Sequence, residues 1–312
     1  MLVPNRGEVY RALEALARDY GLDYFAYPVR YESGEYVFPK LIDRNIQPTD
    51  RVLMIGAGVH ADEVAGPATL ATFGPEILEH ARSRGIKVIL YPLRNPSALG
   101  IPGKRYNTDE VDAQVQVGNN DFVRYEFPDG RIVDDLRDGN VFRFWGWSSE
   151  ERFQVTLPPE TRLMHMLLHE DPLAQVRAAL DLHQDRITPE PFSLSYHYAF
   201  GDVSTYKPII QELEQIIPIA RRRMIGAGYR GLTESGQLTR NAVSQAIRSD
   251  ENGFLIRHDG SWTDLVWRIG ESQGRRIHCI TPETTGATPL GLACRVNLIW
   301  IYGIIDLIAE EA

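Results

Sequence analysis

The sequence predicts a single α/β domain built on a parallel, helix-covered sheet, and three observations indicate it. A short apolar strand at residues 52–55 is followed by a helical segment and then by a second buried strand at residues 86–91. Such a β-α-β unit joins two parallel strands, and helices cover both faces of parallel sheets. The chain of 312 residues can form one large core, and neither an internal repeat nor a low-complexity linker divides it. We therefore expect one domain over residues 1–312.

The first 48 or so residues are expected to form an N-terminal extension. Apolar residues at helical spacing predict a helix at residues 5–20. An extended hairpin is expected at residues 23–42, with its turn at Ser33-Gly34. After the strand at 52–55, a helix is expected from about residue 61 to residue 84, where an Arg-Gly pair ends it.

Residues 97–158 differ from the rest of the chain because they are rich in Asn, Asp, Gly and aromatic residues. We interpret them as a loop-rich insertion over a site, with one hairpin around residues 127–130. A regular pattern then resumes. The expected elements are a helix at 159–170, a strand at 178–183, a polar loop to about 205, a helix at 206–225, a strand at 276–281 and a closing helix at 289–309.

Composition excludes several classes of protein. The chain has the composition of an ordinary globular protein, with a hydrophobic content of 43% and a charged content of 24%. Its net charge of −9 argues against nucleic acid as its main partner. Two cysteines are too few for a disulfide framework, so we expect them to be reduced. The N-terminus lacks the apolar stretch of a signal peptide, and no run of 18 apolar residues predicts a membrane span. We therefore expect a cytoplasmic protein without a membrane partner.

The stretch RVLMIGAGVHADEVAG, at residues 51–66, admits two interpretations. Gly56, Gly58 and Ala61 complete a GxGxxA dinucleotide fingerprint, whereas His60 and Glu63 have the spacing of metal ligands. A dinucleotide site needs an acid at the end of the second strand, and LYPLR has none. Glu63 would also repel a pyrophosphate at the start of the helix. The sequence therefore favours the metal and predicts no organic cofactor.

A catalytic zinc typically takes three protein ligands, often two histidines and a glutamate. His60 and Glu63 leave the carboxyl end of a strand, where open α/β sheets place their sites, so a further histidine is expected at the end of another strand. His183 satisfies this expectation because it ends the apolar strand in AALDLHQD. Asp181 lies on the same strand face and either orients that histidine or is a solvated or helix-capping residue.

Four blocks of this sequence resemble the zinc carboxypeptidase superfamily, including its succinylglutamate desuccinylase and aspartoacylase branch. GVHADEVAGP resembles the HxxE segment, LYPLRNPSALG the next strand with its Asn-Pro turn, LDLHQD the strand of the third ligand, and ITPETTG the strand of the catalytic glutamate. The resemblance implies a three-layer α/β/α sandwich around a mixed, mostly parallel sheet. It also implies one zinc ion per chain held by His60, Glu63 and His183, with Glu283 as the general base.

The same resemblance places Arg105, in GKRYN, where the family has an arginine that polarises the scissile carbonyl. Further along, the family carries an Asn-Arg pair that grips a substrate carboxylate, and this chain has Asp112-Ala113 at the matching spacing. Carboxylate recognition is therefore either absent or moved to another arginine, such as Arg124 or Arg186. Glu283 as a loop acid and Arg105 as a surface arginine are the alternatives for those two residues.

The resemblance implies a zinc-dependent hydrolase that cleaves an amide bond of a small-molecule or peptide substrate. It is consistent with a carboxypeptidase and with a deacylase of N-acyl amino acids, and a binding protein that has lost turnover is the alternative outside enzymes. A rival metal pair, His165 and His169, has the i, i+4 spacing of HExxH but lacks its glutamate. We interpret these two histidines as residues of a helix face.

Overall fold

The computed structural model describes residues 5–101, 104–109, 158–185, 193–221, 249–256 and 261–311, together with six short strands. These strands are β5 (Tyr125–Glu126), β6 (Ile132–Val133), β7 (Val141–Arg143), β8 (Gln154–Thr156), β11 (Met224–Ile225) and β12 (Ile247–Arg248). Strands β5 to β8 pair into a four-stranded antiparallel sheet within the segment predicted to be loops, and β11 pairs with β12. The pairing of β5 with β6 confirms the hairpin predicted around residues 127–130.

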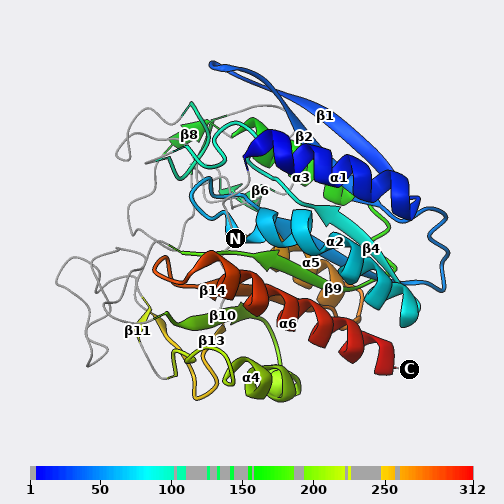
Figure 1. Ribbon diagram of the computed structural model, residues 1–312, viewed down its shortest axis with the longest axis vertical. Coiled ribbons are helices and arrows are strands. Elements are labelled where there is room, and N and C mark those ends of the chain that lie inside the picture. Colours follow the sequence, from blue (N-terminus) through cyan, green and yellow to red (C-terminus); the bar gives the residue numbers. More distant parts are fainter. Residues whose placement is uncertain are drawn as a thin grey trace.

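An eight-stranded sheet runs through the described residues in the order β1-β2-β4-β3-β9-β14-β10-β13 (Figure 1). Its four central strands are parallel, and they are β4 (Ile86–Tyr91), β3 (Arg51–Ala57), β9 (Val176–Leu182) and β14 (His278–Thr284). The outer strands β1 (Asp23–Tyr31), β2 (Gly34–Ile42) and β10 (Ser195–Ala199) run antiparallel to their inner neighbours, and β13 (Phe254–Ile256) runs parallel to β10. The prediction of a mixed, mostly parallel sheet is confirmed.

Helices cover both faces of this sheet (Figure 1). One face carries α1 (Arg6–Tyr20), α2 (Ala65–Ser83), α4 (Lys207–Leu213) and α6 (Leu290–Glu310), and the other carries α3 (Pro159–Glu170) and α5 (Trp262–Ser272). Side chains of β3 alternate between these layers, because Leu53 and Ile55 pack with the first group and Val52 and Met54 with the second. The chain is therefore the predicted three-layer α/β/α sandwich.

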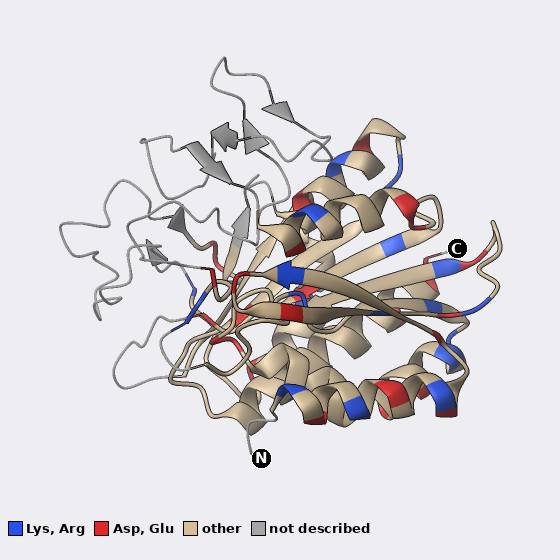
Figure 2. Ribbon diagram, turned by 90° about the horizontal axis from the view of Figure 1, so that it is seen from above, with Lys and Arg blue, Asp and Glu red and all other residues tan. Residues whose placement is uncertain are grey.

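The sequence of α1 shows why this helix forms. Asn5 Oδ1 accepts a hydrogen bond from the Glu8 backbone N–H at 3.0 Å, and Glu8 Oε2 accepts one from the Asn5 N–H at 2.8 Å, which is a capping box. Exposed Glu8, Arg11, Glu14 and Arg18 alternate in sign along the outer face, and Figure 2 shows this mixing of charges on the helix. The opposite face is apolar and packs in the core.

The N-terminal hairpin also forms as predicted. β1 and β2 pair from Asp23 with Ile42 to Tyr31 with Gly34, which puts the turn at Glu32-Ser33, one residue before the expected Ser33-Gly34. Because β2 also pairs with β4, the N-terminal extension belongs to the edge of the main sheet.

Several predicted elements have other limits or other structure. The helix expected at 206–225 starts after a 3-10 turn, Val203–Tyr206, and ends at Leu213. Pro218, five residues further on, could not have continued a helix to residue 225. α2 begins at Ala65 and not near residue 61, since the residues before it form the turn with His60 and Glu63. β10 lies within the predicted polar loop, and α5 was not predicted.

α6 passes a length and composition test for a membrane-crossing helix, and it is the one described helix that does so. Half of its most apolar window, 50%, is buried inside the protein. There α6 contacts α2, α4 and the central strands β3, β9 and β14. This burial is typical of a core helix in an α/β sandwich.

His197, in β10, is a fully buried histidine whose two ring nitrogens have no hydrogen-bond partner among the described residues. The centroid of its ring lies 4.7 Å from that of Trp300 and 5.3 Å from that of Phe254. Burial lowers the pKa of His197 from its ordinary value of 6.5 to about 3. The ring is therefore neutral in the folded chain at pH values where the unfolded chain binds a proton.

We expect His197 to make the free energy of unfolding depend on pH. Above pH 6.5 His197 is neutral in both the folded and the unfolded chain, so it does not lower the stability. As the pH falls from 6.5 towards about 3, the unfolded chain binds a proton there and the folded chain does not. The free energy of unfolding then decreases by up to about 1.4 kcal/mol per pH unit. The variant His197→Phe keeps the apolar packing and removes the titration. Urea unfolding at pH 7 and pH 5 should show a smaller loss of stability in the variant than in the wild type. An equal loss in both proteins would contradict the assignment.

Candidate metal centre

Two neighbouring parallel strands bring three metal-ligating side chains to one edge of the sheet. β3 ends at Ala57, and the turn after it carries His60 and Glu63, whereas β9 ends at Leu182, directly before His183. Ala57 pairs with Leu182, so the residues that follow the two strands emerge side by side. The structure thus brings the three predicted ligands together at the carboxyl edge of the sheet.

The three side chains converge on one point. His60 Nδ1 lies 2.9 Å from Glu63 Oε1, and His183 Nδ1 lies 2.8 Å from Glu63 Oε2. One ligand atom from each residue lies within 4.8 Å of the others, and each side chain is at most 3% exposed. Two imidazole nitrogens with one carboxylate oxygen are typical of catalytic zinc sites, which leave a fourth position open. The donor set therefore fits a divalent metal ion.

The charge of Glu63 agrees with this fit. Burial alone would raise the pKa of its carboxyl, but the positive potential of His60, Arg105 and His183 holds that pKa well below its usual range. Glu63 is thus an ionised carboxylate that is 2% exposed. A buried carboxylate of this kind needs cationic partners, and a metal ion is a suitable one.

Packing explains the glycines at the end of β3. A Cβ atom on Gly56 would lie 2.8 Å from Cζ2 of Trp262, and one on Gly58 would lie 2.6 Å from Cγ of Pro67. Gly58 also has a φ of +64°, in the left-handed region that favours glycine. Close approach of neighbouring side chains therefore accounts for the two glycines of the GxGxxA pattern.

The two residues predicted to act on a substrate lie beside the triad. Arg105 Nη1 lies 2.7 Å from Glu63 Oε1. Glu283, at the end of β14, places its Oε1 3.7 Å from His183 Nδ1. Burial, and then the nearby carboxylate of Glu63, raise the pKa of Glu283 well above its usual range, although His183 opposes the shift. A perturbed carboxyl at such a site is a candidate general acid and base.

Asp181 is buried behind His183, and two residues that the sequence analysis missed hold it. Its Oδ2 lies 3.1 Å from His183 Nε2, and the same oxygen accepts hydrogen bonds from Arg94 Nη1 at 2.6 Å and Trp262 Nε1 at 2.7 Å. Although burial opposes its charge, Arg94 and His183 hold the pKa of Asp181 below its usual range. Asp181 is therefore neither solvated nor a helix cap. The signal in the sequence was Arg94 itself, a charged residue directly after the apolar strand and the Pro-Leu pair in LYPLRNP.

The rival histidine pair lies elsewhere. His165 and His169 are on α3, with their Nε2 atoms 3.2 Å apart, and His165 is buried whereas His169 is exposed. Among the described residues, the one group of three that could hold a metal ion is the triad and does not include them. This placement agrees with their interpretation as helix-face residues.

The predicted substrate-binding positions Asp112, Ala113, Arg124 and Arg186 lie outside the described residues. The departure from the Asn-Arg pair of the family therefore stays a prediction from the sequence.

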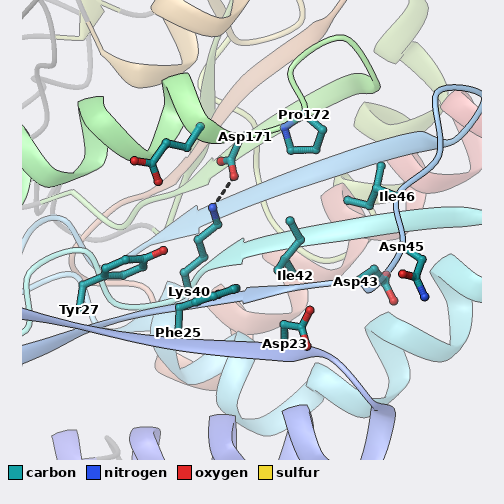
Figure 3. A pocket seen from close by; sticks show the side chains of 11 residues that line it. Asp23, Phe25, Tyr27, Lys40, Ile42, Asp43, Asn45, Ile46, Asp171 and Pro172 are labelled. Carbon is teal, nitrogen blue, oxygen red and sulfur yellow. Dashed lines mark hydrogen bonds and ion pairs between the residues drawn. The ribbon is translucent and has the colours of Figure 1, made fainter.

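A separate hollow of about 440 Å³ lies between the β1-β2 hairpin and the end of α3 (Figure 3). No residue of the triad lines it. Three of its four acids are paired within the protein, and these pairs are Asp171 with Lys40, Asp43 with Arg82 and Asp23 with Arg44. Three of its carboxylates are thus neutralised by basic side chains. We therefore place the candidate functional site at the triad and not in this hollow.

The described chain has a carboxypeptidase-like fold with a buried His-Glu-His triad. Its structural neighbours include a candidate metallopeptidase from Shewanella amazonensis, at 17% identity and a TM-score of 0.61, which matches 96% of this chain and 91% of its own. Bovine thrombin-activatable fibrinolysis inhibitor, solved in complex with a tick carboxypeptidase inhibitor, matches 100% of this chain and 99% of its own at 13% identity and a TM-score of 0.59.

Carboxypeptidase A from Helicoverpa armigera is a further neighbour, at 15% identity and a TM-score of 0.55, covering 99% of this chain and 75% of its own. No protein-family model matches the sequence, and a search of curated proteins finds no match. At these identities the similarity establishes the fold. It confirms the fold that the sequence resemblance implied.

Proposed function

We propose that this protein is a zinc-dependent hydrolase that cleaves an amide bond. The observation that carries the proposal is the buried triad of His60, Glu63 and His183 at the carboxyl edge of a carboxypeptidase-like sheet. Zinc held by these residues would supply a Lewis acid and lower the pKa of a bound water to about 7. We expect one zinc ion per chain.

The residues beside the triad would supply the rest of the chemistry. Glu283 would accept a proton from the attacking water and deliver it to the leaving amine. Arg105 would donate a hydrogen bond to the oxygen of the scissile carbonyl as negative charge develops there, a contribution of roughly 3 kcal/mol in comparable sites. Both side chains lie within 4 Å of a triad residue, Arg105 at 2.7 Å from Glu63 and Glu283 at 3.7 Å from His183.

Among amide substrates, the C-terminal peptide bond is the first candidate because the solved neighbours include a carboxypeptidase A and a protein bound to a carboxypeptidase inhibitor. Deacylation of an N-acyl amino acid is the second candidate, favoured by Asp112-Ala113 in place of the Asn-Arg pair. Assays of the zinc-loaded protein on both substrate types test the proposal. Bound zinc without turnover of either type would favour the non-catalytic binding protein.

We expect simple peptides with a free C-terminus to be poor substrates unless an arginine of residues 120–190, such as Arg124 or Arg186, enters the pocket. An acid at position 112 would repel a substrate carboxylate by about 4 kcal/mol at a separation of ~4 Å and an effective dielectric constant of ~20. The measurement is kcat/KM for matched substrates with a free and an amidated end. A strong preference for the free carboxylate that survives Arg124→Ala and Arg186→Ala would show that the alignment of this segment is wrong. If Asp112 lies far from the site, Asp112→Asn will change neither value.

A further inference from the structure

Asp181 is held between two side chains that come from distant parts of the sequence. Trp262, the first residue of α5, is fully buried, and its ring packs on Gly56 in the space that a Cβ atom would fill. Arg94 is 2% exposed, and its guanidinium carbon lies 5.6 Å from the centroid of the Trp262 ring. Both donate to the same oxygen of Asp181, so two buried side chains hold this carboxylate.

The backbone of Arg94 is anchored to the turn that carries two of the triad residues. The Arg94 N–H donates to the carbonyl of Ala57 at 3.0 Å, and the Asn95 N–H donates to the carbonyl of Gly58 at 2.8 Å. The guanidinium then reaches across to β9, where Asp181 precedes His183 by two residues on the same strand face. Arg94 thus links the two strands that bring the proposed ligands together.

We propose that Arg94 is a positioning residue of the metal centre. By holding Asp181, it fixes the carboxylate oxygen that lies 3.1 Å from Nε2 of His183, the ring whose Nδ1 lies 2.8 Å from Glu63 within the triad. The inference rests on the proposed metal site, because it assigns a role towards that ion. Partners of this kind typically change metal affinity by about 10-fold to 100-fold.

The first measurement is zinc affinity, by competition with a chromogenic chelator. We expect Arg94→Met to weaken binding by about 10-fold to 100-fold, and Arg94→Lys to restore part of the loss because it keeps a donor and a charge. Trp262→Phe removes only the second donor to Asp181 and should weaken binding less. The matched control is Arg51→Met, since the guanidinium of Arg51 donates to the carbonyls of Ile308 and Ala309, away from the triad. The zinc affinity of Arg51→Met should equal that of the wild type.

The second measurement does not depend on zinc or on activity. Nitrogen-15 NMR of the metal-free protein reports the environment of the two ring nitrogens of His183. We expect one ordered set of ring resonances in the wild type and shifted or broadened resonances in Arg94→Met, with Arg94→Lys nearer to the wild type; if Arg94→Met does not fold, Arg94→Lys and Trp262→Phe decide. Unchanged affinity and unchanged ring resonances in the folded variants would overturn the inference. A wild type that binds no zinc would instead overturn the proposed function, and the ring resonances would still test the role of Arg94.

Discussion

Replacement of His183 by alanine should remove most of the bound zinc. The wild type, purified without added metal, is expected to contain about one zinc ion per chain, which elemental analysis measures. His183 supplies one of three converging ligand atoms, and it directly follows β9, whereas the other two ligands follow β3. Two ligands from a single turn would remain, too few for the three protein ligands of a catalytic zinc site.

The control for this experiment is His165→Ala. His165 lies on α3 and bonds with His169, so its loss should leave the zinc content of the protein at about one per chain. A wild-type protein that is free of metal and refuses added zinc would contradict the assignment of the triad. Loss of zinc in His165→Ala with retention in His183→Ala would move the metal site to the other histidine pair.

Local sequence patterns predicted the helices and strands whose apolar residues recur at the regular spacing of one type of element. This was so for the helix α1, the N-terminal hairpin and the β-α-β unit. Each also has a residue that marks where the element stops, such as Gly21, whose φ of +65° ends α1. β10 could not be predicted in this way because its sequence, SYHYA, mixes polar and aromatic residues. Its place between β14 and β13 depends on pairing with distant strands.

The proposed ligands could be predicted because parallel strands end at a common edge, so strand positions in the sequence translate into proximity in space. Arg94 and Trp262 could not be identified as partners of Asp181 in the same way. They are separated from it by 87 and 81 residues, and their convergence depends on how α5 packs on the sheet. A single buried arginine leaves no repeating pattern in the sequence that would indicate its partner. Only the three-dimensional structure shows which carboxylate it holds.

Replacement of Glu283 by glutamine should leave zinc and fold in place and remove most of the turnover. The amide of glutamine has nearly the shape of the carboxyl, but it cannot accept a proton from the attacking water. General acid and base groups typically contribute about 10²-fold to 10⁴-fold, and we expect kcat on the amide substrate of the wild type to fall by that factor. Zinc content should stay at that of the wild type because Glu283 lies outside the group of three proposed ligands.

Two comparisons make this experiment decisive. Glu79→Gln is the matched control, since Glu79 is exposed on α2 and its carboxylate accepts a hydrogen bond from the Tyr20 hydroxyl, so kcat and zinc content should not change. Circular dichroism and the unfolding midpoint would show whether Glu283→Gln keeps its fold, because the residue is only 6% exposed and a glutamine there also needs hydrogen-bond partners. A folded, zinc-containing Glu283→Gln protein with wild-type kcat would mean that another residue is the base. Glu63, the remaining glutamate at the site, would then be the first residue to re-examine.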